Sequence, residues 1–454
     1  MSEKLITTIK VEKLFGLYSY RLPEKGSFFN AAILYGDNGV GKSTVLRLAF
    51  HLLSAAKNRG HRNALYTINF ENLEVELASG VVLNARFSKQ QGHRVLTFEI
   101  LKDAKVLAVW DFHPKAEVEE YLDIQYVTEL NAAGARVIRK KSIKGENQIP
   151  RGKTAFLEML MTYVPTTFIL DADRRLDSDA VSDPSDEMEL RRVMQYEDPR
   201  KINELVGRSR EIALSQAMSS AGQWVWGNAV KGTNQGSMNV HSVYVDVLRH
   251  LMSPSQAAQA PADAKELVKS FDAIELKTNE LSRYEFATQL STLAFRKSLV
   301  ARSRKKSALA AELLKPYIKS LEGRLDAVEP IFQIVDRLVK IVNGMLSDKE
   351  LSYQLSKGFF IQNKLGELLT PAQLSSGEQQ LLLLFCYVLT ARDRPSVFMI
   401  DEPEISLNIK WQRQLVQSLL DITQGATIQF IFASHSIELL AQHKDRVVKL
   451  VNIQ

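Results

Sequence analysis

The stretch Gly36-Asp37-Asn38-Gly39-Val40-Gly41-Lys42-Ser43-Thr44, residues 36–44, decides the fold. It matches the pattern G-x-x-x-x-G-K-[ST], in which glycines let successive backbone N–H groups converge on phosphate oxygens. Lys42 can neutralise charge on the outer phosphates, and the Ser43 hydroxyl can bind Mg²⁺. A short apolar run precedes this P-loop at 31–35, and helix-spaced apolar residues follow over 42–56. Because a chance turn would lack this context, the stretch predicts a site for ATP and Mg²⁺.

Two carboxylates, Asp401 and Glu402, end a second apolar run, 397–400. A buried parallel strand here would deliver both side chains to the sheet edge at which ligands bind. We expect Asp401 to hold Mg²⁺, directly or through water, and Glu402 to polarise the attacking water. A lone Asp-Glu pair is more often a solvated surface feature, but the apolar run and the P-loop favour the catalytic interpretation.

A histidine, His435, follows a third apolar run, 427–433. At the end of a strand beside the γ-phosphate, its side chain can donate a hydrogen bond to that phosphate and respond to hydrolysis. Considered alone, such a histidine is more simply a core residue. Its position after the second strand favours a catalytic role.

The stretch 374–380 reads Leu-Ser-Ser-Gly-Glu-Gln-Gln. It forms a loop that opens a helix, and a helix N-terminus can bind phosphate. Alone it would be an ordinary serine cap. In order with the P-loop, the Asp-Glu strand and the late histidine, it resembles the ABC signature L-S-x-G-[EG]-Q. The nucleotide-binding residues that this resemblance implies are Ser375, Ser376, Gly377 and Glu378.

The four motifs together resemble those of ABC-type ATPases. A P-loop near residue 40 and a signature near residue 375, separated by a helical insertion, is the layout of the SMC, RecF and OLD groups. Residues 401–407 resemble the D-E-P-E-x-x-L-H run of OLD-like ATPases, with Asn408 where histidine is common. The match is most similar to the stand-alone OLD-like ATPases of anti-phage defence systems, such as AriA of PARIS and PtuA of Septu. Since only 19 residues follow His435, we expect no C-terminal Toprim nuclease of the kind that OLD nucleases carry.

The resemblance implies a homodimer with composite ATP sites. Ser376 and Gly377 of one chain would contact the γ-phosphate held by Lys42 of its partner, with residues 404–407 as the D-loop at the interface. Two ATP molecules would be sandwiched per dimer, and a higher homo-oligomer is left open. For the Q-loop glutamine the candidates are Gln125 and Gln148. No aromatic A-loop is evident.

Apolar and β-prone runs at both ends of the chain flank a helical middle. Strands are predicted over 6–22, 31–35, 66–110, 166–170, 396–400 and 427–433. A hairpin is predicted over 352–370, with its turn at 363–366. Helices are predicted over 42–56, 199–252 with an interruption near 227–236, 262–346, 377–391 and 407–422. The block 262–346 is expected to form a helical hairpin or small helical domain rather than a long rod. One apolar face in it is expected to pack on a partner helix, through Leu313, Ile318, Leu321, Leu325, Val328 and residues 331–335.

The strands near the C-terminus alternate with helices, which is typical of a parallel α/β core. We therefore expect an α/β fold: an ABC-type ATPase head, with a P-loop parallel sheet plus an antiparallel β subdomain, split by a helical or coiled-coil insertion. The predicted divisions are 1–175 for the N-terminal half of the head, 176–350 for the insertion and 351–454 for the C-terminal half.

The composition is that of an ordinary soluble globular protein, with 45% hydrophobic and 24% charged residues. The one cysteine, Cys386, cannot form an internal disulfide and is expected to be buried and inert, in a reducing cytoplasm. The N-terminus does not resemble a signal peptide. The longest apolar run, 381–389, is about half a membrane span. We expect no membrane segment, which excludes a transporter unless a separate subunit supplies the pore.

The net charge of +6 is too small by itself to imply nucleic acid. Charge is nevertheless segregated, with eight acidic residues in 171–189 and eight basic residues in 296–319. Two functions follow. The first is a sensor and scaffold of an anti-phage system that controls a separate effector, a Toprim or HNH nuclease, through its ATP state. The alternative is a RecF-like DNA-binding repair ATPase, supported by the basic run, although a solvated helical face explains that run more simply.

Overall fold

The computed structural model describes residues 4–56, 59–90, 93–114, 126–130, 136–140, 151–171, 176–178, 199–237, 245, 260–299, 304–405 and 407–453. Contacts between residues divide the chain into two compact units. The first combines Met1–Leu205 with Ala391–Gln454, and the second is Val206–Thr390. The three-part division made from the sequence stays a prediction; in the structure the signature helix belongs to the second unit.

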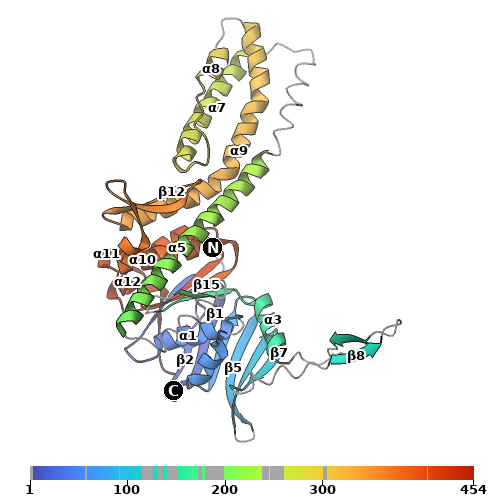
Figure 1. The fold of residues 1–454 in the computed structure, drawn as a ribbon, viewed down its shortest axis with the longest axis vertical. Coiled ribbons are helices and arrows are strands. Elements are labelled where there is room, and N and C mark those ends of the chain that lie inside the picture. Colours follow the sequence, from blue (N-terminus) through green and yellow to red (C-terminus); the bar gives the residue numbers. More distant parts are fainter. Residues whose placement is uncertain are drawn as a thin grey trace. The chain divides into compact units, whose positions relative to one another are not determined.

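A six-stranded sheet forms the centre of the first unit (Figure 1). Its order is β11 (Leu176–Ser178), β10 (Thr166–Leu170), β15 (Ser396–Asp401), β16 (Ile428–Ala433), β3 (Ala31–Tyr35) and β17 (Val447–Lys449). All neighbours are parallel except β11, which pairs antiparallel with β10. Every residue of β15 and β16 is buried, which explains their unbroken apolar sequences. The short strand β17 was not predicted.

Parallel pairing brings the ends of three strands to one edge of this sheet. Asp401 lies opposite Ala433, and Ala433 lies opposite Leu34. The P-loop strand β3 and the Asp-Glu strand β15 are thus separated only by β16. The helix α1 (Lys42–Leu53) packs on β10, β15 and β16, and α11 (Ile409–Ile422) packs with α12 (Ile437–Gln442).

An antiparallel sheet completes the first unit. Its order is β2 (Tyr18–Leu22), β1 (Ile6–Leu14), β4 (Asn72–Leu77), β5 (Val81–Gln90), β6 (His93–Lys102) and β7 (Lys105–Phe112). Alternation in β4, Asn-Leu-Glu-Val-Glu-Leu, buries every second residue.

The helix α3 (Lys153–Tyr163) packs on β6 and β7, as Figure 1 shows. Its contact is aromatic, since Phe156 lies against Phe98 and Trp110. The helix α2 (His61–Thr67) contacts this sheet, since its Tyr66 ring lies against Phe87 and Phe112. A separate two-stranded sheet is formed by β8 (Tyr126–Leu130) and β9 (Arg136–Lys140).

The second unit is mainly helical. It contains α5 (Pro199–Ser237, beginning in the first unit), α7 (Ala260–Leu281), α8 (Leu293–Leu299), α9 (Arg304–Met345) and the signature helix α10 (Ser376–Thr390). A small sheet of β12 (Lys349–Gln354), β13 (Gly358–Asn363) and β14 (Leu368–Leu369) precedes α10. Cys386 in α10 is buried, as expected, and burial raises the pKa of its thiol to about 12.

Two predictions for this unit are wrong. Helix α5 is not interrupted near 227–236, because Gly232 permits a close approach of α9 instead of breaking the helix: a Cβ there would lie 2.5 Å from the Ala327 carbonyl oxygen. The run 352–362 is not one strand, since the chain turns before Gly358, which has φ of +77°. The predicted turn at 363–366 is present, with β14 after it. The helical block 262–346 contains α7, α8 and α9 among its described residues, in agreement with the expected helical hairpin or small helical domain.

The apolar face of α9 is buried within the chain itself. Ile318, Leu325, Val328 and Phe332 pack in one cluster with Leu267, Phe271, Ile274 and Leu281 of α7 and Leu299 of α8. The insertion therefore folds back on itself as a helical hairpin, with α7 beside α9 (Figure 1).

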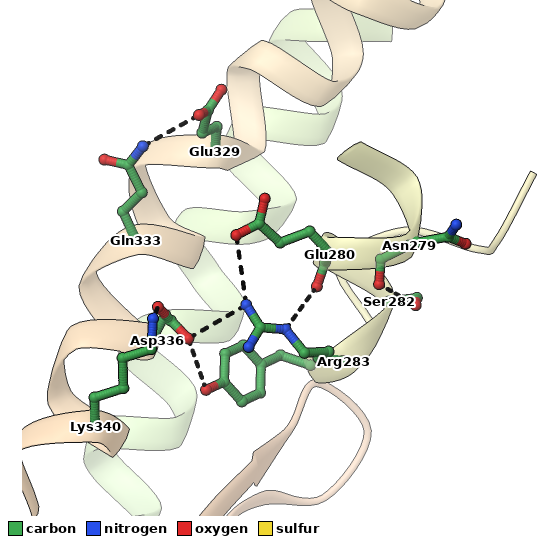
Figure 2. A network of polar contacts seen from close by, with 9 residues as sticks. Asn279, Glu280, Ser282, Arg283, Glu329, Gln333, Asp336 and Lys340 are labelled. Atoms are coloured by element: carbon green, nitrogen blue, oxygen red, sulfur yellow. Dashed lines mark hydrogen bonds and ion pairs between the residues drawn. The ribbon is translucent and has the colours of Figure 1, made fainter. Parts of the chain in front are cut away.

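A polar network closes the end of this hairpin (Figure 2). Asp336 of α9 accepts a hydrogen bond from the Tyr284 hydroxyl at 3.2 Å. It also pairs with Arg283 at 3.5 Å and with Lys340 at 2.6 Å. Burial, followed by the Asp336 charge, raises the pKa of Tyr284 to about 12, so the phenol remains a donor. The Asp336 side chain is only 13% exposed, which makes it the centre of the network.

Asp336→Ala is expected to destabilise the second unit. The change removes a charged acceptor from two donors on the turn after α7, and such hydrogen bonds contribute about 1.5–3 kcal/mol each. Chemical denaturation followed by circular dichroism measures the free energy of unfolding. Lys340→Ala is the matched control, because its side chain is 67% exposed and surface pairs contribute about 0–1 kcal/mol. Equal effects of the two variants would contradict a structural role for Asp336.

The expected fold class is confirmed: a P-loop parallel sheet with an antiparallel β subdomain, and helices inserted between the two halves of its sequence. In the part of the chain that the structure describes, no helix is long and apolar enough to cross a membrane.

Candidate functional site

The P-loop connects β3 to α1 and bends through two left-handed glycines. Gly39 has φ of +82° and Gly41 has φ of +92°. At Gly41 a side chain is also excluded by space, since a Cβ would lie 2.8 Å from Leu14 Cδ2. The loop tip is open, with Asp37, Asn38 and Gly39 exposed. Beyond the tip, Val40, Ser43 and Thr44 are half-buried, the last two on the first turn of α1.

The Lys42 ammonium group lies inside the curve of this loop. It donates hydrogen bonds to the carbonyl oxygens of Gly36 at 2.9 Å and Asp37 at 3.0 Å. The residue is only 4% exposed. Burial lowers the pKa of its amine, whereas the nearby carboxylates, of which Glu402 has the largest effect, raise it. A buried cation beside free backbone N–H groups fits the outer phosphates of a nucleotide.

Ser43 and Asp401 are brought together from positions 358 residues apart in the sequence. The Ser43 hydroxyl donates to Asp401 Oδ1 at 2.7 Å. Asp401 is 1% exposed, and its other oxygen, Oδ2, has no hydrogen-bond partner among the described residues. Burial raises the pKa of this carboxyl, while the Ser43 hydrogen bond opposes the rise. A hydroxyl and an open carboxylate oxygen beside a phosphate site are the donor set that Mg²⁺ takes, together with phosphate oxygens.

No group of three histidine, cysteine, aspartate or glutamate side chains within the described ranges makes a metal site by itself. Mg²⁺ at a nucleotide binds one or two protein groups plus phosphate oxygens, and Ser43 and Asp401 could supply those protein groups.

Glu402 projects from a strained turn directly after β15. Its φ is +49°, and its backbone N–H donates to the Ala433 carbonyl at 2.8 Å. Burial raises the pKa of the Glu402 carboxyl to about 7, with Glu404 and Asp401 adding to the rise. His435 follows the neighbouring strand β16, and its Nε2 lies 3.6 Å from Glu402 Oε1. The predicted base and the predicted histidine are therefore neighbours at one sheet edge.

The signature begins α10 in the second unit. Ser375 and Glu378 cap the helix reciprocally: the Ser375 N–H donates to Glu378 Oε2 at 2.7 Å, and the Glu378 N–H donates to Ser375 Oγ at 3.3 Å. Lys349 binds the same carboxylate at 2.7 Å. With Ser375 used as the cap, Ser376 stays exposed on the first turn and Gly377 is buried.

Sequence reasoning missed two aromatic residues beside the P-loop. The Tyr20 hydroxyl donates to the Val40 carbonyl at 2.9 Å and so supports the loop. Phe15, in the turn after β1, is 43% exposed with φ of +57°, and its Cε2 would touch a Cβ at Gly41 at 3.2 Å. The only signal in the sequence was an apolar residue before a turn glycine, Phe15-Gly16.

Of the other residues singled out in the sequence, the structure describes Asn408, while several lie outside the described residues. Asn408, which stands where histidine is common, caps α11 by accepting from the Trp411 N–H at 2.9 Å. The Q-loop candidates Gln125 and Gln148 lie outside the described residues. So do Ser406, most of the acidic stretch and residues 300–303 of the basic run.

Comparison with known proteins finds ATP-binding relatives over part of the chain. A family model described as "AAA domain, putative AbiEii toxin, Type IV TA system" matches residues 254–441. The molybdenum import ATP-binding protein ModC of Escherichia coli K12 is 36% identical over 84 residues, which is 18% of this chain and 23% of ModC. ModC of Shigella flexneri matches equally. The chain thus spans about a quarter of the length of these curated relatives.

Among solved structures the chain is similar to SMC head domains from two archaea. One is the Smc head of Pyrococcus furiosus with an extended coiled coil, bound to the C-terminal domain of ScpA. The alignment covers 100% of this chain and 97% of that chain, with 13% sequence identity and a TM-score of 0.34. The Smc head of Pyrococcus yayanosii with a coiled coil and joint aligns with 99% and 95%, at 12% identity and a TM-score of 0.36.

Proposed function

With an ABC-type ATP-binding domain as the premise, we propose that this chain hydrolyses ATP as a homodimer and uses its nucleotide state to control a separate effector protein in anti-phage defence. One observation carries the ATPase part. Ser43, Asp401, Glu402 and His435 come from three separate segments and meet at one edge of the parallel sheet, with a buried open oxygen on Asp401.

Each residue at this edge has a task in hydrolysis. The P-loop N–H groups and Lys42 bind the β- and γ-phosphates. Ser43 and Asp401 hold Mg²⁺, which neutralises charge on the phosphates when it is bound. Glu402 orients and polarises the attacking water, and His435 donates a hydrogen bond to the γ-phosphate.

The dimer part rests on the signature and on exposed apolar residues. Ser376 and Gly377 belong to the second unit, and the resemblance to ABC-type ATPases implies that they contact the nucleotide of the partner chain. Ile405 and Ile437 follow the catalytic loops and are 38% and 79% exposed. Apolar side chains exposed next to a polar site are typical of a surface that another protein covers. In a head-to-tail dimer, each chain would cover this surface of the other chain.

Ser376→Arg is expected to stop hydrolysis while leaving ATP binding by the single chain intact. The bulky cation would occupy the place of the partner's γ-phosphate without touching the P-loop of its own chain. ATP affinity and phosphate release are measured separately. Ala372→Arg is the matched control, because it puts the same side chain at an exposed position four residues earlier. Loss of ATP binding in Ser376→Arg alone would contradict a role in the partner's site.

Phe15→Ala is expected to weaken ATP binding about 10-fold, because stacking of a base on an aromatic ring contributes about 1–3 kcal/mol. The exposed ring beside Gly41 is placed to cover the adenine of a nucleotide in the P-loop. Titration with ATP and with triphosphate alone separates the base from the phosphates. Phe29→Ala is the control, since Phe29 is also an exposed phenylalanine of this unit, at 53%. An unchanged preference for ATP over triphosphate would contradict stacking.

The defence role is supported by the resemblance of residues 401–407 to OLD-like ATPases, and by the family matched over 254–441, whose description names a toxin–antitoxin system. The effector we propose is a Toprim or HNH nuclease. The test is co-expression of the tagged chain with its neighbouring genes, followed by purification with and without ATP. Recovery of a neighbouring gene product in one nucleotide state supports the proposal, and failure to recover one in either state contradicts it.

A RecF-like DNA-binding ATPase is the second candidate. Lys297, Lys315 and Lys319 of the basic run are exposed, which favours it. Arg296 of the same run is instead paired with Asp272 at 2.7 Å and Glu275 at 2.6 Å, and this reduces the charge available to phosphates. DNA affinity that falls steeply with salt, together with ATPase activity stimulated by DNA, would favour this candidate over the first.

A further inference from the structure

Glu404 lies two residues after the catalytic carboxylate and is joined to the histidine loop of its own chain. One of its oxygens, Oε1, accepts three hydrogen bonds: from Ser434 Oγ at 2.8 Å, from the His435 N–H at 2.7 Å and from the Ser436 N–H at 2.9 Å. All three donors belong to the segment between β16 and α12, which has no regular secondary structure. The carboxylate therefore supplies acceptors that a helix or sheet would otherwise provide.

A second side chain extends the connection. Gln412 of α11 accepts from Ser436 Oγ at 2.8 Å, and its amide donates to the Leu407 carbonyl at 2.8 Å. Ser436 also caps α12 by accepting from the Leu439 N–H at 3.2 Å. The loop after β15 and the loop after β16 are thus joined at both ends of the segment 434–436.

The hydrogen bonds between Glu404 and the segment 434–436 have a carboxylate as their acceptor. Hydrogen bonds to a carboxylate are roughly twice as strong as those between neutral groups. The other oxygen, Oε2, is buried and accepts no hydrogen bond from any residue in the described ranges. Removing the side chain would leave the His435 N–H without its acceptor, whereas the Ser436 N–H would keep Ser434 Oγ at 3.0 Å. An unpaired backbone N–H drives a loop to rearrange.

We propose that Glu404 is the positioning residue for His435: its carboxylate fixes the backbone of the histidine loop, and thereby holds the imidazole 3.6 Å from Glu402. The proposal deepens the proposed ATPase function and rests on it. It also gives Glu404 a task within its own chain, in contrast to the contact across the dimer interface that the resemblance implied.

Hydrolysis in a double-mutant cycle tests the proposal. Glu404→Ala is expected to lower kcat about 10²-fold, because misplacing a catalytic group by about 1 Å has that effect, with ATP affinity nearly unchanged. The assay is run well above pH 7, so that the Glu402 carboxyl, whose pKa Glu404 raises, is ionised in every variant. In a His435→Ala background Glu404→Ala should then have no further effect, since the two residues act as one unit. Glu404→Gln, whose carbonyl oxygen can still accept, should recover most of the activity. Independent, multiplying effects of Glu404→Ala and His435→Ala, or an unaltered kcat in Glu404→Ala, would overturn the proposal.

Hydrogen exchange of the amides of His435 and Ser436 supplies a readout that does not need turnover. Faster exchange at the His435 amide in Glu404→Ala, with a smaller acceleration at the Ser436 amide and unchanged exchange in β15 and β16, is the expected result. Ser434→Ala serves if the alanine variant at 404 does not fold. It removes the hydroxyl that donates to Glu404 and accepts from the Ser436 N–H, so faster exchange of the Ser436 amide is expected for it. Unchanged exchange in both variants would overturn the proposal. If the wild-type chain fails to hydrolyse ATP, the proposed function fails, while the exchange result still decides the role of Glu404.

Discussion

Lys42→Ala is expected to abolish ATP binding and every activity that depends on it. The ammonium group lies in the curve of the P-loop, held by the carbonyl oxygens of Gly36 and Asp37, where the outer phosphates of a nucleotide fit. Loss of charge-assisted hydrogen bonds worth about 3 kcal/mol corresponds to an affinity roughly 100-fold lower. Because no other buried cation among the described residues lies in this loop, no neighbouring side chain can substitute.

Calorimetric titration with Mg²⁺ and ATP measures this loss. Lys105→Ala is the control, since it removes an exposed lysine from the start of β7 in the same unit. Burial disfavours the charged form of the Lys42 amine and lowers its pKa. Because the variant removes this unfavourably buried charge, the melting temperature of Lys42→Ala should not fall. ATP affinity equal to that of the wild type would contradict the assignment of the P-loop.

Glu402→Gln is expected to slow hydrolysis by about 10²–10⁴ while ATP binding persists, because general-base catalysis contributes about that much. The amide keeps the size of the side chain but cannot polarise water. Since hydrolysis then no longer separates the dimer, the variant should accumulate as an ATP-bound dimer. Single-turnover phosphate release and light scattering in the presence of ATP measure the two effects.

The same carboxyl predicts a pH dependence. The pKa of Glu402 is raised to about 7, so the carboxyl is protonated below that pH and cannot act as a base. For the wild type, kcat/KM should therefore rise with pH through about 7, since this ratio reports groups of the free enzyme. The residual activity of Glu402→Gln should lack this step, whereas Glu24→Gln, at an exposed position, should retain it. Turnover of Glu402→Gln equal to wild type would exclude Glu402 as the base.

The parts of the site that sequence could predict are those in which a motif follows an apolar run. The runs 31–35 and 166–170 coincide with β3 and β10, and the helix after the P-loop begins at Lys42 as its spacing indicated. In each case local residues decide the outcome, because a fully buried parallel strand needs a continuous apolar sequence.

The parts that sequence could not predict depend on contacts between distant residues. Gly232 appeared to be a helix breaker, yet it serves a close approach to Ala327, which lies 95 positions away. Phe15 and Tyr20 reach the P-loop only because β1 and β2 pair beside it. Glu404 looked like a D-loop residue, and its three donors lie about 30 residues further along the chain. No periodicity or spacing carries such information.

The central claim is that a complete ATP site needs the P-loop of one chain and the signature of another. Lys42→Ala and Ser376→Arg should each be inactive when measured alone. In a mixed dimer, however, one of the two sites combines a normal P-loop with a normal signature. If the two variants are mixed and allowed to exchange, about a quarter of wild-type turnover should return, because half of the dimers are mixed and each holds one intact site. Turnover that stays at background after subunit exchange would contradict the two-chain site.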